Sequence, residues 1–107
     1  MSFDERQKGF ERKFSLDQET IFKIEARASK LIGKWAAEKM GLTGVDAENY
    51  AKEVISVNLD EPGYDDVKRK IEDDFAAKNI QVTSGELDKI IDKSVTDAAA
   101  QIEAEKI

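Results

Sequence analysis

The fold is decided by residues 17–41, which read DQETIFKIEARASKLIGKWAAEKMG. Apolar side chains recur in this stretch at steps of three and four residues, the spacing that places them on one face of an α-helix. Ser15 and Gln18 have the spacing of a capping box at a helix start, and Gly41 stands where a left-handed residue ends a helix. We therefore expect one long amphipathic helix over about residues 17–40. Its inner face is expected to carry Ile21, Ile24, Ala28, Leu31, Ile32 and Trp35.

Three further amphipathic helices follow by the same spacing of apolar residues. The turn at Asp60-Glu61-Pro62-Gly63 separates the second from the third, because Pro and Gly both end helices. Thr83 and Glu86 form a capping signal for the last one. Short links between amphipathic helices predict an all-α, antiparallel four-helix bundle over residues 17–107. The three helices are expected over about residues 46–58, 64–78 and 84–105. Their inner faces are expected to include Tyr50, Val54, Val67, Ile71, Phe75, Leu87, Ile91 and Val95.

Composition excludes several classes of function. The 107 residues suffice for one domain, and the net charge of -6 disfavours binding to a phosphate backbone. The chain has no Cys and no His, so it has no thiolate chemistry and lacks the usual proton shuttle at neutral pH. No apolar run approaches the roughly 20 residues of a membrane span, and the first residues do not form a secretory signal. We expect a cytoplasmic protein that does not insert into a membrane.

Motifs for catalysis or for cofactor and metal binding are missing from the pattern. Gly41-Leu-Thr-Gly44 lacks the Lys and the spacing of a phosphate-binding loop. The acidic turn that begins at Asn58 places Pro62 and Arg69 where a calcium loop needs oxygen ligands. The sequence therefore predicts no enzyme, no cofactor and no metal ion.

Residues 1–16 differ from the rest of the chain. They hold three of its five Phe, namely Phe3, Phe10 and Phe14, and their net charge of +1 leaves -7 on the remainder. Gly9 weakens a helix here by about 1 kcal/mol relative to Ala, and an isolated helix of this length is marginal in water. One interpretation is a flexible arm that becomes helical on a partner. The other is that the segment extends the first helix and its Phe side chains cap the core.

The chain resembles the zeta subunit family, the inhibitor of ATP synthase in alphaproteobacteria. The similarity rests on a set of short motifs in a fixed order through about three quarters of the chain. In the N-terminal part these are Phe3-Asp-Glu-Arg6, Phe10-Glu-Arg-Lys-Phe14, Asp17-Gln-Glu19, Phe22-Lys23, Ala26-Arg27, Lys30-Leu31, Gly33 and Trp35-Ala-Ala37. Further along they are Gly41-Leu-Thr-Gly44, Tyr50-Ala51, Asp60-Glu-Pro-Gly63, Asp66-Val67 and Arg69-Lys70.

This resemblance implies a function. The protein would inhibit the F1 sector of ATP synthase, its arm inserting at a catalytic interface between the alpha and beta subunits, near the gamma rotor. It would block rotation in the direction of ATP hydrolysis, from the cytoplasmic F1 sector of the membrane-bound enzyme. The partner-binding residues would be Phe3, Asp4, Arg6, Lys8, Phe10, Arg12, Lys13 and Phe14.

Two alternatives stay open from the residues alone. The first is a non-enzymatic helical interaction module or scaffold that binds through the surface of its bundle. The second is a bundle that senses adenine nucleotide through a weak contact, for which Lys68, Arg69 and Lys70 offer positive charge.

Overall fold

The computed structural model describes residues 18–60 and 63–105, and all regular structure within these ranges is α-helical. Every helix bound lies within two residues of the bound expected from the sequence. The all-α, four-helix fold is therefore confirmed. The N-terminal segment 1–16, with the capping residue Ser15, lies outside the described residues. The helices are α2 (Gln18–Lys39), α3 (Gly44–Asp60), α4 (Asp65–Ala77) and α5 (Ser84–Glu105).

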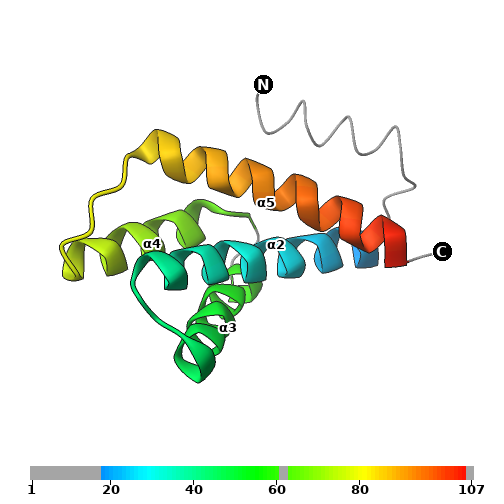
Figure 1. The fold of residues 1–107 in the computed structure, drawn as a ribbon. Coiled ribbons are helices and arrows are strands. Elements are labelled where there is room, and N and C mark those ends of the chain that lie inside the picture. Colours follow the sequence, from blue (N-terminus) through cyan, green and yellow to red (C-terminus); the bar gives the residue numbers. More distant parts are fainter. Residues whose placement is uncertain (1–17, 61–62, 106–107) are drawn as a thin grey trace.

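Helix α2 is the centre of the arrangement, and both α3 and α5 pack against it. Figure 1 shows α5 running alongside α2 in the opposite direction, while α4 runs in the same direction as α2. Helix α3 is steeply inclined to α2. The C-terminal end of α5 consequently lies beside the N-terminal end of α2, where residues 1–17 join the bundle.

The crossing of α2 and α3 depends on Gly33. A Cβ atom at this position would lie 2.7 Å from the Cα of Ala51 and 3.3 Å from the Cβ of Val54. Both partners belong to α3, so the absence of a side chain lets the two helices approach closely. This is a packing role that the sequence pattern did not predict, because a glycine inside a helix ordinarily only lowers its stability.

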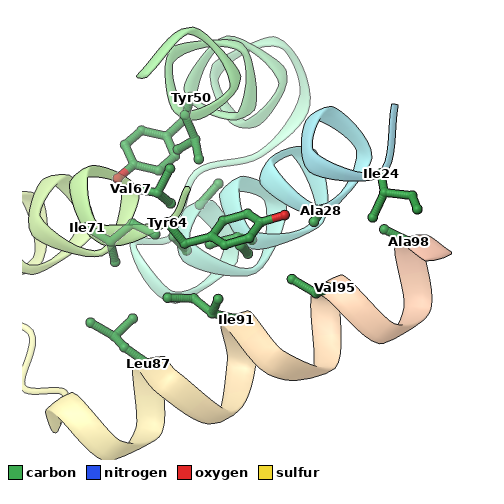
Figure 2. Close-up of a cluster of buried hydrophobic side chains, with 14 of the residues drawn as sticks. Ile24, Ala28, Tyr50, Tyr64, Val67, Ile71, Leu87, Ile91, Val95 and Ala98 are labelled. Carbon is green, nitrogen blue, oxygen red and sulfur yellow. The ribbon is translucent and has the colours of Figure 1, made fainter. Parts of the chain in front are cut away.

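The core is a single cluster of apolar side chains from all four helices, shown in Figure 2. Phe75 and Ile71 of α4 and Ile32 of α2 are at most 1% exposed. Tyr64 is the residue before α4, and its ring lies between α2 and α5 in the middle of the cluster. Trp35 is half-buried and packs against the core, its ring centroid 5.8 Å from that of Phe75. The inner faces expected from the sequence therefore meet in one core, except that Ile21, expected on the inner face of α2, is only partly buried and lies outside this cluster.

The predicted cap at Gly41 is confirmed. Its φ is 78°, and the amide of Leu42 donates to the carbonyl of Ala37 at 2.9 Å. The amide of Gly41 donates to Glu38 at 3.1 Å, which completes a Schellman motif. Leu42 packs against the core after this turn, so the cap also directs the chain from α2 into α3.

A second cap of the same kind ends α4, and it was not predicted from the sequence. Asn79 adopts a φ of 60°, and the amide of Ile80 donates to the carbonyl of Phe75 at 2.9 Å. Asn is the residue after Gly that most readily takes this conformation. The capping signal predicted at the start of α5 is present, since Thr83 Oγ1 accepts a hydrogen bond from the amide of Glu86 at 3.0 Å.

Candidate functional site

The residues predicted to bind a partner all precede the first described residue, Gln18. The structure therefore does not bring them together or separate them, and their roles stay predictions. They are Phe3, Asp4, Arg6, Lys8, Phe10, Arg12, Lys13 and Phe14. What the structure does describe is the end of the bundle to which this segment is attached.

Arg27 holds this end of the bundle together. Its guanidinium donates to Gln101 Oε1 at 2.8 Å and to both carboxylate oxygens of Glu105, at 2.8 and 3.1 Å. The two-pronged geometry suits the planar guanidinium group, and Lys could not reproduce it. Arg27 thereby links the last turn of α5 to α2, close to the N-terminal end of α2.

A shallow hollow with basic walls lies at the same end of the bundle. Its volume is about 500 Å³. Its apolar lining residues come from α2, α3 and α5, whereas its basic lining residues all come from α2. Sequence reasoning missed this site, although the spacing of its cations by four and three residues was a usable signal. The lining residues are Lys23, Ala26, Arg27, Lys30, Ile55, Ile102 and Glu105.

A polar cluster joins α3 to α4. The Tyr50 hydroxyl donates to Asp74 Oδ2 at 2.7 Å, and the Lys70 ammonium donates to the same oxygen at 3.0 Å. Lys70 also lies 3.6 Å from Glu53 and 5.1 Å from the centre of the Tyr50 ring. Burial raises the pKa of Tyr50 well above its ordinary value, and the hydrogen bond to Asp74 adds to the shift. Tyr50 stays protonated at neutral pH, so this cluster acts as a fastening between two helices.

The basic run proposed as a weak nucleotide contact does not converge on one site. Lys68 lies 2.9 Å from Asp88, and Arg69 lies 2.8 Å from Asp66. Lys70 is engaged in the cluster between α3 and α4. Consecutive residues on a helix diverge, and here each cation meets a different carboxylate.

A second hollow, of about 470 Å³, opens beside Lys68. Three carboxylates line it, those of Asp65, Asp88 and Asp92. Lys68 is the basic residue in its lining and pairs with Asp88. A hollow with this balance of charge repels phosphate groups, so it does not favour a nucleotide.

Tyr64 and Glu25 are two further titratable groups whose environment raises their pKa. Burial raises the pKa of the Tyr64 hydroxyl above its ordinary value, and the charge of Glu25 adds to the shift. Burial also raises the pKa of the Glu25 carboxyl. Tyr64 is therefore neutral at physiological pH, and its ring serves as part of the core.

Within residues 18–60 and 63–105, no group of three or more acidic side chains is placed to hold a metal ion. Across those same residues, none of the helices combines the length and the apolar character needed to cross a membrane.

Comparison with known protein families gives a match that covers most of the chain. The family model described as ATPase inhibitor subunit zeta matches residues 1–101. It covers the N-terminal segment as well as all of α2, α3 and α4 and most of α5. No curated protein matches the chain significantly.

Proposed function

Because this chain belongs to the family of ATPase inhibitor zeta subunits, we propose that it stops ATP hydrolysis by inserting its N-terminal arm into the F1 sector of ATP synthase. The observation that carries the proposal is that the family match begins at residue 1. The segment that is rich in Phe therefore belongs to the matched region together with the bundle. In this proposal the arm occupies a catalytic interface between the alpha and beta subunits, near the gamma subunit.

The arm supplies the insertion. Phe10 and Phe14 are four residues apart, so in a helix they lie one turn apart on the same face. Two aromatic anchors in adjacent pockets are typical of a segment that folds as it binds. Phe3 adds a third apolar contact, and Arg6 and Lys8 with their neighbours Arg12 and Lys13 pair with acidic groups at the rim of the cleft.

The bundle supplies the stop. Its four helices share one core, and Arg27 fastens α5 to α2 close to the attachment point of the arm. A packed body of four helices is too wide to follow the single helix of the arm into a cleft between subunits. The arm therefore enters to a fixed depth, and rotation in the hydrolysis direction is blocked. The site of action is the cytoplasmic F1 sector of the membrane-bound enzyme.

The two central Phe residues provide the test. Phe10→Ala and Phe14→Ala should each raise the concentration needed for half-inhibition of F1 from an alphaproteobacterium by about 30-fold, the equivalent of about 2 kcal/mol for an anchor residue. Val45→Ala is the matched control, because Val45 is an apolar residue of α3 that is 69% exposed. It should inhibit as the unchanged protein does. Equal inhibition by all four proteins would contradict the proposal and would favour an interaction module that binds through its bundle.

A further inference from the structure

Helix α2 carries a basic stripe that stands out on a protein of net charge -6. Lys23, Arg27, Lys30 and Lys34 follow one another at steps of four, three and four residues, so they share the solvent face of the helix. Lys23 makes a surface pair with Glu19 at 3.3 Å. Lys30 is exposed and forms no ion pair with another described residue.

Apolar groups accompany the first half of this stripe. Ala26 of α2, Ile55 of α3 and Ile102 of α5 line the hollow of about 500 Å³ whose walls hold Lys23, Arg27 and Lys30. Phe22, next to Lys23 in the chain, is 56% exposed. An exposed aromatic ring close in the chain to a hollow lined by apolar and basic side chains is typical of a surface that binds another protein.

The position of this surface identifies its partner. Lys23 is five residues from Gln18, the first residue of α2, which is about 7.5 Å along a helix. When the arm is held in a cleft, the first turns of α2 must lie at the mouth of that cleft. The face formed by Phe22, Lys23, Ala26, Arg27 and Lys30 begins within the first two turns of α2, so it lies close to the enzyme in this arrangement.

We propose that this face, which we call the α2 basic face, is a second contact with the F1 sector and takes an acidic surface of the subunits that form the cleft. This inference rests on the proposed function, since it assumes that the arm inserts into F1. Lys23 and Lys30 steer the bundle toward the acidic surface, and Phe22 packs on it. Arg27 is already bound to Glu105 and shapes the hollow instead.

Exposed charges at the edge of a contact act mainly on the rate of association and on its dependence on salt. An apolar anchor acts mainly on the rate of dissociation. The double variant Lys23→Glu/Lys30→Glu should therefore associate with F1 at least tenfold more slowly at low salt. The difference should shrink at 0.5 M salt. Phe22→Ala should instead dissociate faster.

The matched control is Lys89→Glu/Lys93→Glu. These two lysines lie on α5, are exposed, and change the net charge by the same amount. Association and inhibition are measured with F1 detached from the membrane, so that a lipid surface cannot contribute, and at two concentrations of ATP. Circular dichroism establishes that each variant is folded.

The inference predicts slow association for Lys23→Glu/Lys30→Glu and nearly unchanged association for the α5 control. If the two double variants associate with F1 at equal rates while the unchanged protein still inhibits, this inference is overturned and the proposed function stands. A difference that depends on the ATP concentration would also overturn it, because the stripe would then bind an anionic ligand. If the unchanged protein neither binds F1 nor inhibits it, the proposed function itself is overturned.

Discussion

Replacing Gly33 by Ala should destabilise the protein, although Ala is the better helix former. Ala is favoured over Gly inside a helix by about 1 kcal/mol. The added Cβ, however, would stand 2.7 Å from the Cα of Ala51. Ordinary contacts between carbon atoms are about 3.5–4.0 Å, and a backbone atom cannot rotate away. Helices α2 and α3 would therefore have to separate by about 1 Å.

The cost of this separation exceeds the gain in helix propensity. Overpacking a well-filled interface costs about 1–3 kcal/mol, and the contacts of Val54 loosen with it. We expect the free energy of unfolding to fall by about 1 kcal/mol net, which lowers Tm by about 4–8 °C in a domain of this size. Thermal and denaturant unfolding followed by circular dichroism measure both quantities.

Gly85→Ala is the matched control for this prediction. Gly85 is also helical, but the nearest atom to its added Cβ is Thr83 Oγ1 at 3.9 Å, an ordinary contact. Here the helix propensity acts alone, and Tm should rise by a few degrees. A Gly33→Ala protein that is stabilised as much as Gly85→Ala would refute the close approach of α2 and α3.

Three further predictions concern single side chains of the bundle. Thr83→Ala removes the acceptor of the Glu86 amide and should lower the free energy of unfolding by about 1 kcal/mol in denaturant titrations; an unchanged midpoint would contradict the cap. The Ser29 hydroxyl is fully buried without a hydrogen bond to any residue that the structure describes, so Ser29→Ala should leave stability equal or raise it by about 1 kcal/mol, and a loss of stability in the same titration would contradict this. Burial raises the pKa of Glu25 above its ordinary value of 4.5, which means that the folded state binds its proton more tightly than the unfolded state and that the penalty appears as pH rises above 4.5. Glu25→Gln should therefore stabilise the protein at pH 7 and change little at pH 4, and the opposite dependence in melting curves would contradict the assignment.

Helix positions were predictable because each helix carries its own signals. Apolar steps of three and four residues marked the faces that hold Ile24, Val67 and Leu87, all buried in the core. Gly41 marked the end of α2, because a glycine that follows an amphipathic helical pattern commonly forms the C-terminal cap. Asn79 performs the same task but was missed, since an Asn in a polar link has many other uses.

Packing and surface chemistry were harder to predict because they depend on neighbours far along the chain. The role of Gly33 comes from Ala51 and Val54, which lie on another helix. The run Lys68-Arg69-Lys70 carried positive charge in the sequence, whereas in the structure its members face three different carboxylate partners. The spacing of the cations on the α2 basic face was visible in the sequence. The apolar residues Ile55 and Ile102 that line the same hollow could not be predicted, because they come from α3 and α5.

The central claim is that inhibition resides in the N-terminal arm. The most direct measurement is ATP hydrolysis by detached F1 from an alphaproteobacterium, titrated with the full chain and with a version that lacks residues 1–16. The buried core cluster lies between Ile24 and Ile102, so the shortened protein should keep its helical circular dichroism and its cooperative melting. The account predicts inhibition by the full chain and none by the shortened protein at the same concentrations. Equal inhibition by both proteins would contradict it and would assign the activity to the bundle.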